Sequence, residues 1–126
     1  RGGGRTFGPR VRSYTQKVNK SVKKLARKSA LSIKVKSKNL TVIEDFDFDI
    51  PKTKSILKVL EALGISAKKS LFVLDNSKKN VFLSARNLKN INVLSNDDLN
   101  TYNIMNAQHL IISEVALETI EKNLLK

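Results

Sequence analysis

The spacing of apolar and polar positions predicts an irregular start followed by one long helix. Residues 1–14 show no hydrophobic period, and their four glycines together with Pro9 disfavour regular structure. Residues 17–35 have the period of an amphipathic helix. Its apolar face contains Val18, Val22, Leu25, Ser29 and Ile33. Its opposite face is cationic and contains Lys20, Lys23, Lys24, Arg27, Lys28 and Lys34. Lys36 would fall on the apolar face, so we expect the helix to end before it.

From residue 40 onward, short apolar runs alternate with helical patterns. Strands are predicted at 40–46, 70–75, 91–95 and 109–114, and helices at 52–63, 80–88, 99–106 and 115–125. In the helix at 52–63, one face collects Ile56, Val59, Leu60 and Leu63, and Gly64 is a natural C-terminal stop. The last helix offers Val115, Leu117, Ile120 and Leu124 for burial.

Apolar strands separated by helices indicate a parallel sheet that is covered on both faces. The sequence therefore predicts an α/β fold, namely a small three-layer sandwich with a mostly parallel sheet. The expected topology is doubly wound and Rossmann-like without a dinucleotide motif, and an extended basic arm precedes it. We divide the chain into this arm, residues 1–16, and a globular α/β domain, residues 17–126.

Length and composition restrict the class of protein. The chain has 126 residues, which suits one domain. It has no cysteine, which removes disulfides and thiolate sites and fits a reducing compartment. No signal peptide or apolar run of membrane-spanning length is visible, so no membrane partner is expected. The first residue is Arg1 rather than methionine, so we expect the chain to begin inside a longer gene product.

The charge of the chain is segregated along its length. The formal net charge is +13, and residues 1–38 contain thirteen lysines and arginines and no acid. Residues 39–126 contain eleven cations and eleven acids, so their charges cancel. Like charges close together oppose compaction, and folding does not require them. This segregation indicates a polyanionic partner.

The motifs of nucleotide-binding and metal-binding sites are absent. A dinucleotide site needs G-x-G-x-x-G directly after a strand, whereas Gly64 is the single glycine beyond residue 8, and no G-x-x-x-x-G-K-[ST] is present. Asp45, Asp47 and Asp49 resemble the start of an EF-hand loop, which then needs a glycine and a glutamate where this chain has isoleucines. We expect these acids to solvate a loop, with Asp49 helping to cap the helix that begins near Pro51.

Catalytic machinery is not visible either. His109 is the only histidine, and a neutral or surface role is expected for it. No G-x-S-x-G nucleophile motif occurs. We therefore expect no enzyme activity, no catalytic residue, no metal, no cofactor and no small-molecule substrate.

The basic segment has the residue types that nucleic-acid binding uses. Arginines offer bidentate contacts to phosphates and base edges, and lysines act as point charges. Phe7 and Tyr14 lie among the cations of the arm and could stack on unpaired bases, or they could pack the arm against the domain. No helix-turn-helix, zinc-finger, RNP or KH pattern is present. An unstructured arm that leads into a folded domain suits the irregular crevices of a large RNA better than the regular grooves of DNA.

Specific tracts narrow the choice of RNA. The opening "RGGGRTFGPRVRSYTQKVNKSVKKLARKSALS" resembles the bacterial large-subunit ribosomal protein L4 family, at the returning limb of its long loop and the helix that follows. The resemblance continues through "VIEDF", "PKTKSILKVLEALG", "NVFLSARNL" and "LNTYNIMNA" to the last helix. The chain departs from the common pattern at Val11, where proline is frequent, and at Ser13, where aspartate is usual.

The resemblance implies a structural protein of the large ribosomal subunit in the cytoplasm. It would bind large-subunit ribosomal RNA, support subunit assembly and the wall of the peptide exit tunnel, and contact neighbouring large-subunit ribosomal proteins. The N-terminal strands and helices of the family's domain and the loop tip would be missing from this chain. The implied RNA contacts in the arm are Arg1, Arg5, Arg10 and Arg12, with Gly3, Gly4 and Gly8 allowing close backbone approach. Those on the helix are Lys17, Lys20, Lys23, Lys24, Arg27 and Lys28.

Some assignments stay open from the sequence. Arg86 and Asn87 are further candidates for RNA contact, although turn and cap chemistry explains them equally well. The alternatives to a ribosomal protein are an α/β enzyme that binds a small molecule and carries a basic targeting tail, and an RNA-binding regulator that acts off the ribosome.

Overall fold

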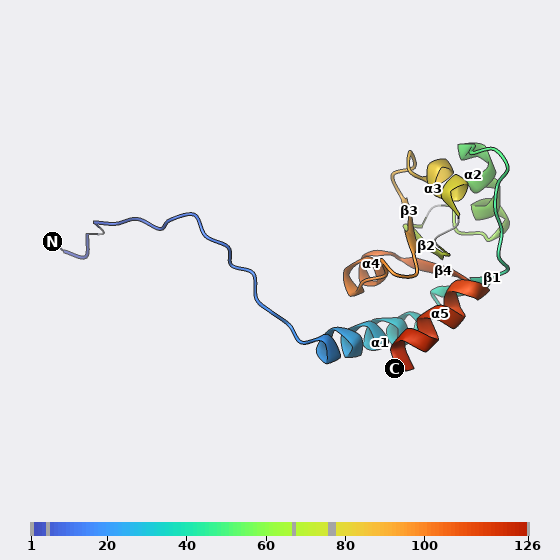
Figure 1. Cartoon of the computed structure of the whole chain (residues 1–126). Helices are drawn as coiled ribbons and strands as arrows, with labels where there is room; N and C mark the ends of the chain where they lie inside the picture. The colour runs from blue at the N-terminus through green and yellow to red at the C-terminus, as the bar shows by residue number, and fades with distance from the viewer. Residues whose placement is uncertain (1, 5, 67, 76–77, 126) are drawn as a thin grey trace.

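The protein has an extended N-terminal arm and a layered α/β body (Figure 1). The computed structural model describes residues 2–4, 6–66, 68–75 and 78–125. The strands are β1 (Leu40–Ile43), β2 (Ser70–Leu74), β3 (Ile91–Ser95) and β4 (His109–Ser113). The helices are α1 (Lys20–Lys36), α2 (Thr53–Ala62), α3 (Lys79–Ala85), α4 (Thr101–Asn106) and α5 (Glu114–Leu125). Every strand and helix that the sequence predicts is present, with small shifts at the ends.

The four strands form one parallel sheet in the order β1-β4-β2-β3. The strand β4 comes last in the chain and lies between β1 and β2, with Ile112 opposite Val42 on one side and Val73 on the other. Since all three strand pairs are parallel, the predicted α/β class is confirmed.

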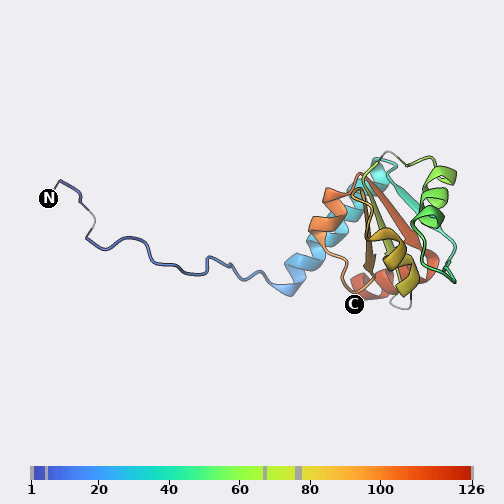
Figure 2. The ribbon, with the colours of Figure 1, turned by 90° about the horizontal axis from the view of Figure 1, so that it is seen from above.

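Helices cover both faces of the sheet, and alternate residues of each strand point to opposite faces. On one face, Leu71, Val73, Leu110 and Ile112 share a core with residues of α1, α4 and α5. On the other face, Phe72, Leu74 and Ile111 share a second core with residues of α2 and α3. The view from above shows the sheet between these two helical layers (Figure 2). This arrangement confirms the predicted three-layer sandwich.

Helix α1 packs through a different face from the one that the sequence predicts. The residues of its apolar stripe are largely exposed, Val22 by 53%, Leu25 by 68% and Ile33 by 47%. The buried face is instead centred on Ala30 and Lys34, with Leu31 half-buried beside them. Small side chains allow α1 to approach the body closely, so the contact face follows from the position of the sheet rather than from the strongest apolar stripe.

Lys34 is therefore wrongly placed on the exposed cationic face by the sequence analysis. Only 8% of this residue is exposed, and its Nζ donates a hydrogen bond to the carbonyl oxygen of Ala107 at the end of α4. The aliphatic stem of a lysine can fill a core position when the ammonium finds an acceptor. The helix also includes Lys36, one residue beyond the predicted end. The chain leaves the helix through Lys38, which lies in the left-handed region at φ 55°.

The ends of the other helices show which capping predictions hold. Gly64 follows α2 with a φ of 68°, which confirms its role as the stop of that helix. The N-cap of α2 is Lys52, which makes no side-chain capping bond, so the prediction that Asp49 caps this helix is wrong. Val115 on α5 is 47% exposed, and Ala116 is buried in its place.

Within the described parts of the chain, no helix is both long and apolar enough to cross a membrane.

Candidate nucleic-acid interface

The arm is the most exposed cationic segment that the structure describes. Residues 6–19 have no helix or strand and lead away from the body in both views (Figures 1 and 2). Arg10 and Arg12 are exposed, and so are Gly3, Gly4 and Gly8. Arg1 and Arg5, two further predicted contacts, lie outside the described residues. At roughly 3.3 Å per residue, a fully extended segment with the length of residues 6–19 reaches about 46 Å.

The aromatic side chains of the arm are also in solvent. Phe7 is 77% exposed and Tyr14 is 71% exposed. The guanidinium carbon of Arg12 lies 4.8 Å from the centroid of the Tyr14 ring, which is a cation–π contact. The alternative in which these rings pack the arm against the body is therefore not the arrangement in this structure. Both rings keep faces on which a base could stack.

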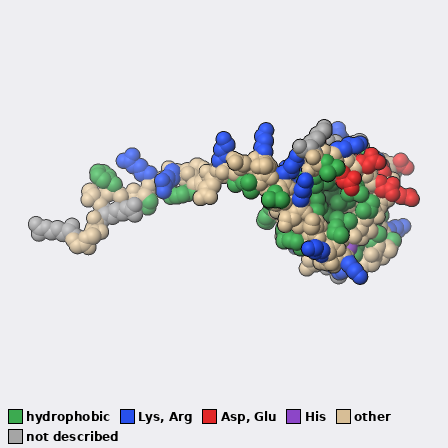
Figure 3. All heavy atoms as spheres, turned by 90° about the horizontal axis from the view of Figure 1, so that it is seen from below, with side chains coloured by type: hydrophobic (Ala, Val, Ile, Leu, Met, Phe, Trp, Pro, Cys, Tyr) green, Lys and Arg blue, Asp and Glu red, His purple; other side chains and the backbone are tan. Residues whose placement is uncertain are grey.

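The cations of α1 divide into exposed and half-buried groups. Lys20, Lys23 and Lys28 are exposed, whereas Lys24 and Arg27 are half-buried. Lys17 precedes the helix, which begins at Lys20 rather than at residue 17, so Lys17 belongs to the extended segment. The exposed cations of the arm and helix stand out along one connected stretch of the molecule (Figure 3).

A groove separates the first turns of α1 from the connection between β3 and α4. Its volume is about 370 Å³, and Val22, Lys23, Ala26 and Arg27 line it on the helix side. Asp97, Asp98 and Leu99 line the other side. The two acids lower the positive potential at this groove, so the strongest attraction for a polyanion lies outside it, at the arm and the exposed lysines.

Arg86 and Asn87 lie at the end of α3, where the chain turns toward β3. Both are exposed, and the backbone N–H of Arg86 donates to the carbonyl of Phe82 at 3.0 Å. The turn is closed by a bond from the Leu88 N–H to the Ala85 carbonyl at 2.9 Å. These bonds use the backbone of the turn and leave both side chains directed to solvent, so either role proposed for them is compatible with the structure.

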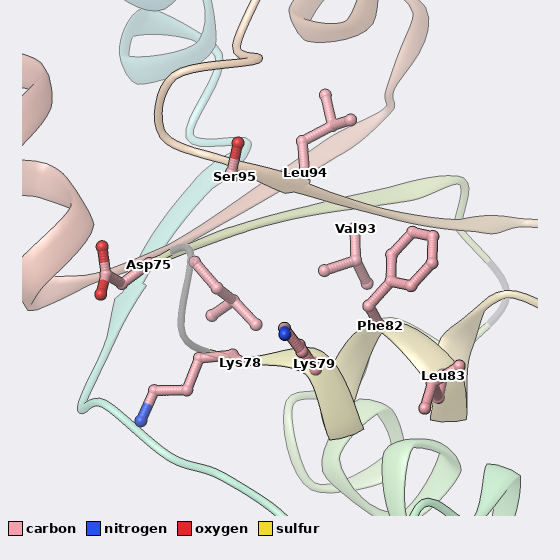
Figure 4. Close-up of a pocket in the computed structure, with 9 residues that line it drawn as sticks. Asp75, Lys78, Lys79, Phe82, Leu83, Val93, Leu94 and Ser95 are labelled. Atoms are coloured by element: carbon pink, nitrogen blue, oxygen red, sulfur yellow. The ribbon is translucent and has the colours of Figure 1, made fainter.

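A second hollow of about 370 Å³ lies at the carboxyl ends of β2 and β3 (Figure 4). Phe82 and Val93 face each other across it, and Leu83 and Leu94 extend the apolar lining. Lys78 directs its ammonium away from the hollow to Asp45, at an Nζ–Oδ2 distance of 2.8 Å. This hydrogen bond, strengthened by the charge of the same carboxylate, raises the pKa of Lys78. The hollow is therefore mainly an apolar contact surface.

His109 is a structural histidine at the start of β4. It is 7% exposed, and its Nε2 lies 2.9 Å from the hydroxyl of Thr41 on β1. Its Nδ1 is buried and has no hydrogen-bond partner within the described part of the chain. Burial lowers the pKa of His109, and the positive charges of Lys68 and Lys34 lower it further. The ring is therefore held neutral between two strands. The described residues contain no cluster of three side chains that could hold a metal ion.

Comparison with known proteins gives this arrangement a family. Residues 1–123 match the model of the ribosomal protein L4/L1 family. The chain belongs to that family. Its sequence is 59% identical, over all 126 residues, to the large ribosomal subunit protein uL4 of Flavobacterium psychrophilum. It is 56% identical over its whole length to the uL4 protein of Flavobacterium johnsoniae. It is 58% identical over 124 residues to that of Christiangramia forsetii.

The match is complete for this chain and partial for its relatives. The chain spans 60% of the length of each of these three uL4 proteins. The family resemblance that the tracts "FGPR", "LSARNL" and "LNTY" indicate is thereby confirmed.

Proposed function

We propose that this chain is part of a structural protein of the large ribosomal subunit and binds large-subunit ribosomal RNA through its arm and α1. The observation that carries the proposal is the separation of charge from fold. Residues 1–38 contain thirteen cations without an acid, and the described part of the arm lies in solvent, outside the core. Names of the relatives as large-subunit proteins support the same role.

The mechanism is charge neutralisation along an ordering arm. Each cation that meets a phosphate releases condensed counterions, which favours binding at low salt. Arg10 and Arg12 provide planar forks for phosphate oxygens, and the glycines of residues 2–8 allow the backbone to approach RNA closely. With a reach of about 46 Å for residues 6–19 alone, the arm can enter RNA far from the body and contribute to the wall of the peptide exit tunnel. This lets phosphate-rich segments approach one another during assembly.

Neighbouring large-subunit proteins are the second class of partner that we propose. Two surfaces of the described structure support this proposal, because each exposes apolar side chains to solvent. One is the stripe of Val22, Leu25 and Ile33 on α1, and the other is the hollow beside Phe82 and Leu83. Contact with protein would remove these side chains from water.

The test is RNA binding at a series of salt concentrations. The helix variant K20E/K23E/K28E reverses three exposed cations, avoiding Lys24 and Arg27 because they are half-buried. The control variant K52E/K54E/K79E makes the same change of charge at exposed lysines of other segments. The probe is a transcript of the large-subunit ribosomal RNA, and thermal unfolding monitors the fold of each variant.

We expect the helix variant to bind at least about tenfold more weakly at 100 mM salt. The slope of log affinity against log salt should fall in magnitude by about 2, since each lost contact contributes 0.7 to 0.9. The control should bind nearly as the natural chain does. Equal losses in both variants would show that net charge, rather than this surface, governs binding, and would overturn the assignment.

A further inference from the structure

The charges of the body, which cancel in sum, are separated along the direction of the strands. Eight of its eleven acids directly follow strands at their carboxyl ends, four in residues 44–49, one at 75, two at 97–98 and one at 114. The other three are on helices α2 and α5. In Figure 3 the visible acid side chains gather at the part of the body remote from the arm. The carboxyl edge of the sheet is therefore acidic.

The opposite edge of the sheet is cationic. Lysines directly precede three of the four strands, and we call them the amino-edge lysines: Lys36, Lys38, Lys68, Lys69 and Lys89. Arg86, in the turn before β3, adds one more cation at this end. The described residues contain two ion pairs, and none of the five lysines takes part in either of them. A cationic edge thus stands against an acidic one. Lys36 and Lys38 come from the basic segment 1–38, and the other cations of this edge come from residues 39–126, whose charges cancel.

Backbone hydrogen bonds hold the segments of this edge in a fixed row. The N–H of Leu110 donates to the carbonyl of Asn39 at 2.9 Å, and the N–H of His109 donates to the carbonyl of Lys69 at 3.1 Å. A third bond runs from the N–H of Ser70 to the carbonyl of Asn90 at 2.9 Å. These bonds link the starts of all four strands. Since neighbouring strands lie about 4.8 Å apart, the row is about 14 Å wide.

A small hollow at this edge favours an anion. Its volume is about 50 Å³, and Lys69 and Lys89 line it together with Asn90, Asn92, Asn103 and Asn106. Amide and ammonium groups donate hydrogen bonds, and a hollow of this volume suits a phosphate oxygen better than a base.

We propose that this amino edge is a second RNA-binding surface, which contacts the phosphodiester backbone of a folded RNA. The inference rests on the proposed function. The arm leaves the first turn of α1, whereas the amino edge lies at the last turn, and the 17 residues of the helix separate the two sites by about 25 Å. One chain thereby holds two separate segments of RNA.

The edge variant K36E/K68E/K89E tests this surface in the full chain. These three lysines are exposed, and Lys69 is left in place because its Nζ donates to the Oδ1 of Asn106 at 3.0 Å. The probe is the same ribosomal RNA transcript, and K52E/K54E/K79E is again the control with equal charge. We expect at least tenfold weaker binding for the edge variant and a salt slope smaller in magnitude by about 2. Hydroxyl-radical footprinting should show two protected RNA segments with the natural chain and one with the edge variant.

The outcomes separate this inference from the proposed function. If the helix variant loses affinity and the edge variant binds and protects RNA as the control does, the amino edge is not an RNA surface. If neither variant differs from the control, the proposed function itself is wrong. An edge variant that binds RNA normally but fails to join the subunit would assign this edge to a protein neighbour and overturn the inference. Should the reversed charges impair folding, the neutral variant K36Q/K68Q/K89Q gives the same comparison, with loss of the second footprint as the deciding observation.

Discussion

The packing of α1 gives a direct test of the structure, because two adjacent residues are expected to respond in opposite ways. Lys34 is 8% exposed and its Nζ bonds to the Ala107 carbonyl, whereas Ile33 is 47% exposed. The hydrophobic pattern alone predicts the reverse, with Ile33 in the core and Lys34 in water. Replacing each residue by alanine therefore separates the two descriptions of the helix.

The expected magnitudes follow from the groups that each substitution removes. Lys34→Ala deletes three buried methylenes at about 0.8 kcal/mol each. It also deletes a hydrogen bond, with a net contribution of about 1 kcal/mol, and relieves the desolvation of an ammonium. The expected loss is about 2–3 kcal/mol. Ile33→Ala removes side-chain carbons that are half in water and gains helix propensity, so we expect a loss of less than about 1 kcal/mol. Lys34→Met keeps the buried stem and should lie within about 1 kcal/mol of the natural chain.

Thermal unfolding followed by circular dichroism measures these differences. For a domain of this size, a loss of 2–3 kcal/mol lowers the melting temperature by roughly 10 °C. We therefore expect a clear decrease for Lys34→Ala and a small one for Ile33→Ala and Lys34→Met. If Ile33→Ala proves more damaging than Lys34→Ala, α1 packs through its apolar stripe, and the structural account of this helix is refuted.

Two further predictions concern a buried ring and a turn. The lowered pKa of His109 means that the unfolded chain binds a proton more readily than the folded chain, so stability should be full above pH 6.5 and decline as pH falls through the lower folded pKa. Denaturant unfolding between pH 7.5 and 5 should show this decline, and His109→Gln should remove most of it; an unchanged profile would contradict the assignment. Gly64→Ala places a side chain at a φ of 68° and should lower the free energy of unfolding by about 1 kcal/mol, whereas Ala62→Gly, inside α2, tests ordinary helix propensity at a neighbouring site.

The fold was largely predictable because its main signals are local. Apolar strands such as 91–95 coincide with the observed β3, and Gly64 marks the end of α2 as expected. The strand order was not predictable, because nothing local in residues 109–113 indicates that this segment inserts between β1 and β2. Tertiary position decides that placement.

The candidate site shows the same division between local and tertiary information. The cationic segment, residues 1–38, can be predicted from the sequence, since charge segregation is a property of the sequence itself. The error at Lys34 arose because a helical period identifies an apolar face without identifying which face meets the sheet. The sequence alone does not single out the amino-edge lysines, for a related reason. They are scattered in sequence, and parallel strands bring them together, so their signal in the sequence is their repeated position just before a strand.

The central place of β4 has a consequence for biosynthesis. Leu40 pairs with Leu110, and among the described residues β1 has no strand partner other than β4. During translation from the N-terminus, β1 can therefore pair with β4 only after residues 109–113 have emerged, about 65 residues after β1 itself. The leading cationic segment is in solution throughout this interval. The cationic segment can thus bind nucleic acid before the body is complete. A nascent chain truncated before residue 109 would still attract RNA through residues 1–38, but it would lack β4, the strand that joins β1 to β2.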